Sequence, residues 1–234
     1  MILNVAFTLL LASAVLAQTP SPQDRAAALK ESLAQNQAAL RAYTWIETTQ
    51  VTLKGEVKKQ EQKQCYYGAD GKVQKTAVPG AAAPQPQQSA GGGRKGGRVK
   101  QNIVENKVDD MKEYMERVVT LVHEYVPPDP KKIQAAQAAG NVSTQPSGAG
   151  ATLGVKNYVK TGDELAIGFD TAAKQLSSYA VKSYVEKPKE DDVSLAVTFG
   201  KLEDGTSYPQ RIVLDVKAKN IQVNVTNSGY KKKS

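Results

Sequence analysis

The spacing of hydrophobic and polar positions changes several times along the chain, and each change marks a different kind of element. Ser21 to Asp24 have the residue types of a helix N-terminus, and strong helix formers follow them, so we expect a helix over about 22–42. From Tyr43 to Thr76, β-branched and aromatic residues alternate with polar ones. This alternation predicts three antiparallel strands in a meander, with a turn at Gly68-Ala69-Asp70-Gly71.

The clearest helical pattern lies between residues 104 and 125. Apolar residues recur there at steps of four and three, at Val104, Val108, Met111, Met115, Val118, Val122 and Tyr125. Such spacing places one apolar stripe along a helix. Pro127 and Pro128 end this helix, and a second, short helix is expected over 131–139. A loop is predicted from Ser143 to Gly150.

The C-terminal third returns to a period of two. Six further strands are predicted between residues 153 and 225, mostly joined by hairpin turns such as Lys160 to Asp163 and Glu203 to Gly205. The total is about nine strands and three helices, without the βαβ alternation of a parallel sheet. This order predicts an α+β fold with an antiparallel sheet. We expect a strongly curved sheet, a half-open β-barrel, with the helices packed on its concave face.

Residues 77–100 interrupt this organisation. They are rich in Pro, Gly, Ala and Gln, so they can bury little apolar area, and a long disordered loop is expected within a single domain over 18–234. The stretch Gly91 to Arg98 lacks the Lys-Ser or Lys-Thr pair of a phosphate-binding loop. It also lacks the aromatic residues that stack on nucleic-acid bases. A solvated loop is therefore predicted, with no nucleic-acid partner.

The first seventeen residues have the features of a cleaved secretory signal. An apolar run from Val5 to Leu16 ends in the small-residue pattern Ala14-Val15-Leu16-Ala17, and it is too short to span a bilayer. The alternative is a buried N-terminal core helix. With no second long apolar stretch, we expect an exported protein without a membrane span, periplasmic or secreted after cleavage of residues 1–17.

Charge and cysteine content add little to this picture. The chain has 31 Lys and Arg against 23 Asp and Glu, a net charge of +8, which favours anionic surfaces. Part of this charge lies in the glycine-rich loop and in Lys231 to Lys233. Cys65 is the only cysteine, so no intramolecular disulfide can form, and a buried thiol is expected.

The candidate chemical groups do not form a catalytic pattern. His123 is the only histidine, and no second His or Cys stands at metal-ligand spacing from it. Acidic pairs such as Asp109-Asp110 and Glu203-Asp204 lie at an expected helix start and in turns, where solvation and the helix dipole explain them. We therefore predict a protein that is not an enzyme and that holds no metal or cofactor.

Three short segments carry a resemblance to a known family. They are Tyr43-Thr44-Trp45 entering the first strand, the Gly68 to Gly71 hairpin, and Asp204 to Pro209 before two C-terminal strands. With the order of elements, they resemble the periplasmic lipoprotein-localisation-factor superfamily, which includes LolA, LolB and RseB. The resemblance implies a half-open barrel plugged by helices that binds acyl chains or partner proteins. It supplies no binding residues, and the loop at 77–100 departs from the family.

The apolar stripe of the 104–125 helix is the candidate site. Val108, Met111, Met115, Val118 and Val122 are predicted to line a cavity, because methionine adapts to varied ligand shapes. The same stripe fits an ordinary core. Two functions therefore stay open. One is a carrier or sensor that holds lipid acyl chains or a lipoprotein between sheet and helices. The other is a module that binds envelope proteins and has a filled core and no lipid ligand.

Overall fold

The computed structural model describes residues 31–32, 34–78, 97–148 and 150–233, with side chains described outside 97–108. The predicted signal peptide at 1–17 and most of the predicted loop at 77–100 lie outside the described residues. Helical residues 31–32 and 34–40 precede the first strand, as the capping and helix-forming residues predict. Two further helices follow, α2 (Gly97–His123) and α3 (Pro130–Ala138).

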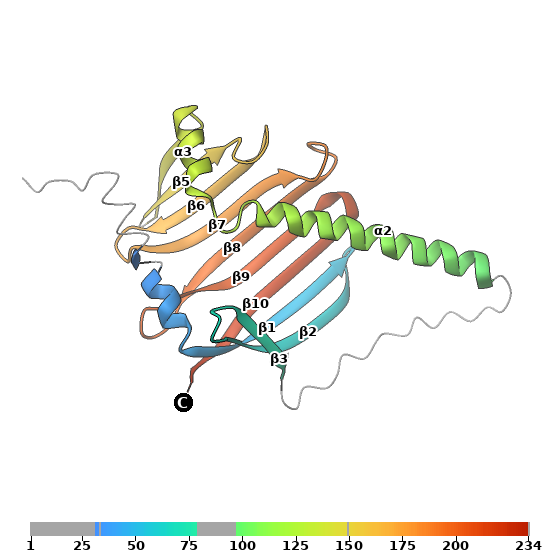
Figure 1. The fold of residues 1–234 in the computed structure, drawn as a ribbon, viewed down its shortest axis with the longest axis horizontal. Coiled ribbons are helices and arrows are strands. Elements are labelled where there is room, and N and C mark those ends of the chain that lie inside the picture. Colours follow the sequence, from blue (N-terminus) through green and yellow to red (C-terminus); the bar gives the residue numbers. More distant parts are fainter. Residues whose placement is uncertain (1–30, 33, 79–96, 149, 234) are drawn as a thin grey trace, which may run out of the picture.

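One antiparallel sheet of ten strands forms the body of the fold (Figure 1). The strands are β1 (Tyr43–Leu53), β2 (Glu56–Tyr67), β3 (Val73–Ala77), β4 (Val142–Ser147), β5 (Gly150–Lys156), β6 (Glu164–Asp170), β7 (Gln175–Tyr184), β8 (Asp192–Lys201), β9 (Ser207–Val216) and β10 (Ile221–Lys232). Their order across the sheet is β3-β2-β1-β10-β9-β8-β7-β6-β5-β4. Because the last strand pairs with the first, β1 and β10 lie side by side in the middle of the sheet.

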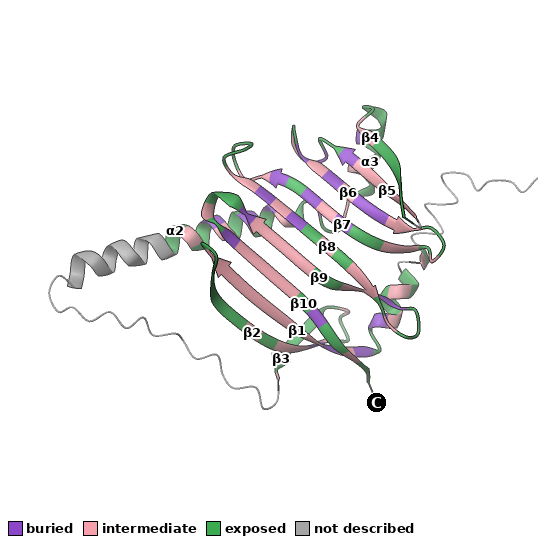
Figure 2. Ribbon diagram, turned by 180° about the vertical axis from the view of Figure 1, so that it is seen from behind, coloured by how far each residue is buried: buried purple, intermediate pink, exposed green. Residues whose placement is uncertain are grey.

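Helix α2 lies across one face of the sheet, as Figure 1 shows from the front and Figure 2 from behind. Three of its side chains, Tyr114, Val118 and Leu121, are buried in the main hydrophobic cluster, together with Tyr125 in the turn that follows the helix. Their partners come from the sheet: Val155, Leu165, Ile167, Tyr179, Val181, Val193, Leu195, Val216 and Ile221. Burial of each large apolar side chain contributes about 1.5–3 kcal/mol before entropy is counted. Docking of α2 is therefore a major source of stability. We call the face that α2 covers the α2 face.

The predicted fold class, α+β with an antiparallel sheet, is confirmed. The sheet is open, with β3 and β4 as its edge strands. Strong curvature and the packing of helices on a concave side stay predictions. The short third helix is present as α3, where Asp129 accepts a hydrogen bond from the Lys131 amide (2.8 Å) and caps the first turn. No helix among the described residues is long and apolar enough to cross a membrane.

Two predicted boundaries were wrong. The loop expected from Ser143 to Gly150 contains strand β4. Because β4 is an edge strand with every side chain except that of Val142 exposed, its sequence lacks the alternation that marks a half-buried strand. The loop expected to extend to residue 100 ends earlier, since α2 begins at Gly97.

Candidate functional site

The buried stripe of α2 is rotated from the predicted one. Val118 is fully buried, as expected, but Met111, Met115 and Val122 are only partly buried and pack at the margin of the core. Tyr114 and Leu121 are buried in their place, and Val108 belongs to the part of α2 whose side chains are not described. Successive residues turn by about 100° around a helix, so the three partly buried side chains share one flank beside the buried stripe. We call Met111, Met115 and Val122 the Met flank.

The direction of the Met flank follows from contacts on the opposite side of α2. Arg117 projects from that side and is ion-paired with Glu186 in the turn after β7. Lys219, in the turn between β9 and β10, lies over the Tyr114 ring (4.9 Å). The Met flank therefore faces away from these turns and toward the middle of the sheet.

The α2 face of the sheet carries apolar side chains in rows that cross the strands. Residues paired across neighbouring strands point to the same face, so the register defines each row. The first row lies near α2 and contains the buried Val193, Val216 and Ile221 and the partly buried Leu53. The second row contains Leu195, Leu214, Val223 and Val51, and the third contains Val197, Ile212, Val225 and Thr49. We call the second and third rows the middle rows.

Side chains in the middle rows are less buried than those in the first row. Leu195 is buried, but Leu214, Val223 and Val51 in the second row and the whole third row are only half-buried. The opposite face of the same strands carries Ser, Thr, Asn and Gln side chains, such as Ser194, Asn224 and Gln50. Apolar area in the middle rows is thus concentrated on the same face as the Met flank.

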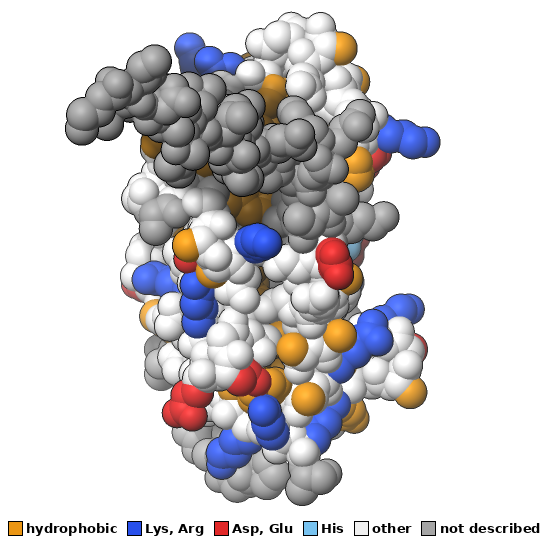
Figure 3. All heavy atoms as spheres, turned by 90° about the vertical axis from the view of Figure 1, so that its left-hand side faces the viewer, with side chains coloured by type: hydrophobic (Ala, Val, Ile, Leu, Met, Phe, Trp, Pro, Cys, Tyr) orange, Lys and Arg blue, Asp and Glu red, His pale blue; other side chains and the backbone are white. Residues whose placement is uncertain are grey.

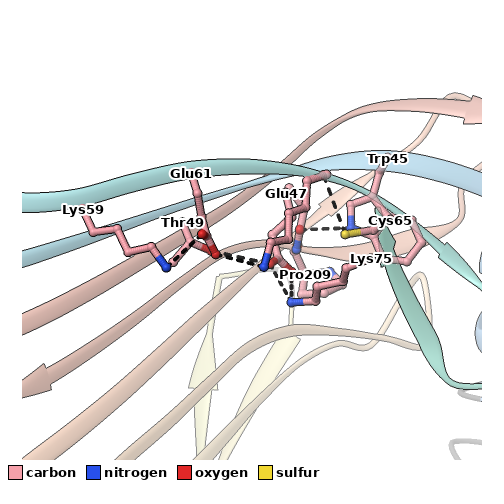
Figure 4. A network of polar contacts seen from close by, with 10 residues as sticks. Trp45, Glu47, Thr49, Lys59, Glu61, Cys65, Lys75 and Pro209 are labelled. Atoms are coloured by element: carbon pink, nitrogen blue, oxygen red, sulfur yellow. Dashed lines mark hydrogen bonds and ion pairs between the residues drawn. The ribbon is translucent and has the colours of Figure 1, made fainter. Parts of the chain in front are cut away.

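Charged residues on β1, β2 and β3 border the middle rows. Glu61 accepts ion pairs from Lys59 (2.9 Å) and Lys63 (3.1 Å), and Glu47 accepts from Lys75 (2.6 Å) (Figure 4). Hydrogen bonds from Lys59 and then Lys63 hold the pKa of Glu61 below its usual value. Each of these two carboxylates therefore faces a lysine, and because three lysines are present the apolar surface ends at a polar margin with one excess positive charge.

An aromatic cluster closes the end of the α2 face that lies farthest from α2. The Trp45 ring stacks on Tyr230 (centroids 5.5 Å apart) and contacts Tyr67 (5.5 Å). Trp45 donates through its ring nitrogen to the buried Asn227 side chain (3.1 Å), which itself donates to the Pro209 carbonyl (2.8 Å). These contacts fix the strand ends and give the apolar rows a rigid boundary.

Two cavities lie beside this end, next to the helical residues 31–32 and 34–40. The inner one has a volume of about 100 Å³, and its apolar walls are Leu40, Leu176, Phe199 and Pro209. Phe199 and Pro209 are paired across β8 and β9, one step beyond Val197 and Ile212 of the third row. The outer cavity, about 510 Å³, is polar. Figure 3 views this side of the molecule, where hydrophobic side chains are visible among Lys and Arg.

The other residues that the sequence singled out do not form a reaction centre. His123 is exposed on α2. Cys65 is buried, as predicted, and desolvation raises the pKa of its thiol. Among the described residues, no group of three or more His, Cys, Asp or Glu side chains is placed to hold a metal ion. The arrangement on the α2 face is suited to holding an apolar ligand by contact.

Sequence reasoning missed one buried polar group that positions α2. Asp163 was assigned only to a turn, yet its side chain is 2% exposed and accepts hydrogen bonds from the Tyr125 hydroxyl (2.5 Å) and the Tyr158 amide (2.6 Å). The Val159 and Lys160 amides complete the shell at 2.9 and 2.8 Å. No signal in the sequence links this aspartate to Tyr125, which is 38 residues away. It fixes the C-terminal end of α2 over the sheet.

Comparisons with known proteins find a similarity in structure but none in sequence. No protein-family model matches the chain, and no curated protein matches it. The chain is similar in structure to a LolA superfamily protein from Nitrosomonas europaea. The two share 9% identity and a TM-score of 0.38, over 88% of this chain and 94% of the other. The predicted resemblance is thus matched by a similarity that concerns the fold alone.

Proposed function

We propose that this chain is an exported binding protein, without enzymatic activity, that holds lipid acyl chains or the acyl part of a lipoprotein. The ligand lies on the middle rows, between the concave α2 face and the Met flank. The observation that carries this proposal is the half-buried apolar surface formed by Leu214, Val223, Val225 and their row neighbours. Contiguous apolar surface that is left partly uncovered is typical of binding sites.

Side-chain chemistry at this surface favours a flexible, apolar ligand. Aliphatic side chains of the rows offer contact without direction, and the two methionines of the Met flank adapt to chains of different shape. The β2 border places lysines beside the rows, with Lys59 next to Val51 in the register. Export through the segment 1–17 brings the protein to the envelope, where lipids and lipoproteins are available.

A pair of matched substitutions tests the proposal. Val225 lies in the third row, and the adjacent Thr226 is exposed on the opposite face of β10. The full chain is expressed in bacteria, its bound lipids are analysed by native mass spectrometry, and its affinity for a fluorescent fatty-acid analogue is measured. We expect Val225→Gln to weaken binding about tenfold, and Thr226→Gln to leave it unchanged.

The Met flank gives a second readout. Because Met115 is half-buried, Met115→Asp is expected to keep a cooperative thermal transition while losing affinity for the analogue. Loss of the fold in this variant would assign the Met flank to the core. A wild-type protein that carries no lipid and does not bind the analogue would overturn the proposal and favour the protein-binding module.

A further inference from the structure

The inner cavity beside the helical residues 31–32 and 34–40 contains polar groups that are held in place. Asn36 donates through its side chain to the Ser207 carbonyl (2.7 Å) and accepts from the Ser207 amide (2.6 Å). The Gln175 side-chain NH₂ donates to the Gly205 carbonyl (2.9 Å). The Ser32 hydroxyl donates to the Lys174 carbonyl (2.6 Å). These bonds join the helix to the β6–β7 and β8–β9 turns and fix each polar side chain of the cavity.

Two of these side chains keep a buried polar atom without a partner. The Gln175 Oε1 and Ser207 Oγ atoms are buried and have no hydrogen-bond partner among the described residues, and Ser207 is 4% exposed. Buried polar atoms in proteins are nearly always hydrogen-bonded, so a pair lining one cavity calls for a ligand. Since the NH₂ group of Gln175 is engaged with Gly205, its free atom is an acceptor.

The remaining walls define the charge and shape of this ligand. None of the side chains lining the inner cavity is charged, whereas Glu31, Lys174 and Asp204 line the outer cavity. A charged group in the inner cavity would lose its hydration without gaining a counter-ion. Phe199 and Pro209 continue into Val197 and Ile212, so an alkyl chain that leaves the cavity meets the third row.

We propose that the inner cavity binds the head group of a single-chain amphiphile that is uncharged and carries both a hydrogen-bond donor and an acceptor. An undissociated carboxyl or a primary amide has this pattern. The donor bonds to Gln175 Oε1, the acceptor receives the Ser207 hydroxyl, and the alkyl chain lies along the third row. This assignment rests on the proposed function, because it uses the same apolar surface for the chain.

Decanamide is the probe, and it is compared with two other compounds with ten-carbon chains that differ only in the head group. We expect decanamide to bind the full chain about tenfold more tightly than N,N-dimethyldecanamide, which has no N–H donor, and more tightly than decyl sulfate, which is charged. Affinities are measured by calorimetry. Ser207→Ala should lower the affinity for decanamide about tenfold. Ser32→Ala is the matched control, because it removes a hydroxyl from the same cavity whose hydrogen bond is already made within the protein.

The outcomes distinguish the two proposals. If all three decyl compounds bind equally well and Ser207→Ala has no effect, the inner cavity does not hold the head group, and the head-group assignment is overturned while the acyl site stands. If no decyl compound binds, the proposed function fails as well. Because the comparison of head groups uses wild-type protein, it stays decisive even if Ser207→Ala does not fold.

Discussion

Removal of one hydroxyl group, in Tyr125→Phe, tests how α2 is fixed over the sheet. The Tyr125 side chain is fully buried, and its hydroxyl donates to Asp163 (2.5 Å) and lies 2.8 Å from the Ser183 hydroxyl. Phenylalanine keeps the ring and its packing, so the substitution isolates the hydrogen bond. Asp163 retains its backbone donors, and its carboxylate stays partly compensated.

The expected loss of stability follows from the charge on the acceptor. A hydrogen bond to an ionised group contributes about 1.5–3 kcal/mol, and a carboxylate that is 2% exposed does not readily replace a lost donor with solvent. We therefore expect Tyr125→Phe to lower the free energy of unfolding by about 2 kcal/mol. For a chain of this length, each kcal/mol corresponds to a decrease in Tm of about 2–4 °C.

Urea unfolding followed by circular dichroism measures this difference. Tyr184→Phe is the matched control, because the Tyr184 hydroxyl donates to the Thr161 carbonyl (2.9 Å) at an exposed site. A surface substitution of this kind is expected to change stability by less than about 0.5 kcal/mol. If the two variants were equally stable, the reasoning that a buried carboxylate depends on the Tyr125 hydroxyl would be refuted.

The same contact predicts an effect of alkaline pH. Burial first, and then the hydrogen bond to Asp163, raise the pKa of Tyr125 far above its usual value. In the unfolded chain a tyrosine ionises near pH 10, so the folded state binds the proton more tightly. Stability is therefore complete below about pH 10 and falls as pH rises beyond it. In Tyr125→Phe the free energy of unfolding should therefore fall less steeply above pH 10. Urea unfolding of both proteins from pH 8 to 11 measures this, and an equally steep fall in the variant would contradict the prediction.

Three further substitutions or modifications test other parts of the structure. Val118→Ala should cost about 2 kcal/mol because Val118 is fully buried, while Val119→Ala, at a side chain 47% exposed, should cost little; thermal unfolding of both compares them. The pKa of the Asp204 carboxyl lies below its usual value, mainly because the Tyr43 hydroxyl donates a hydrogen bond to it and next because Thr206 donates through its side chain and amide. NMR titration should therefore show a higher Asp204 pKa in Tyr43→Phe. Native protein should react with a thiol reagent only after unfolding, since Cys65 is buried, and fast labelling under native conditions would contradict this.

Local pattern was sufficient for the elements whose two faces differ. Strands such as β8 and β9 alternate apolar and polar residues because one face contacts the core, and this alternation is visible along the chain. The helical period of α2 was equally clear. Strand β4 was missed because an exposed edge strand needs no such alternation.

Which side of α2 is buried was decided by the tertiary structure. Residues 111–125 carry two overlapping apolar stripes, one through Met115 and Val122 and one through Tyr114 and Leu121. They are offset by one residue, about 100° around the helix, and the residues of each recur at helical spacing, so spacing alone cannot rank them. The contact of Tyr125 with Asp163 and the ion pair of Arg117 with Glu186 fix the rotation that buries Tyr114 and leaves the methionines at the margin.

The sequence by itself therefore determined the antiparallel α+β class, the helical stripe and the expectation of export. Tertiary structure alone brought together groups that are distant along the chain. Asn36 and Ser207, 171 residues apart, form a reciprocal pair, and Gln175 joins them in one cavity. Each of these residues is an ordinary polar residue in its own segment. Only folding removes them from water, and a buried oxygen without a hydrogen-bond partner is unusual in proteins, which is why these residues suggest a ligand.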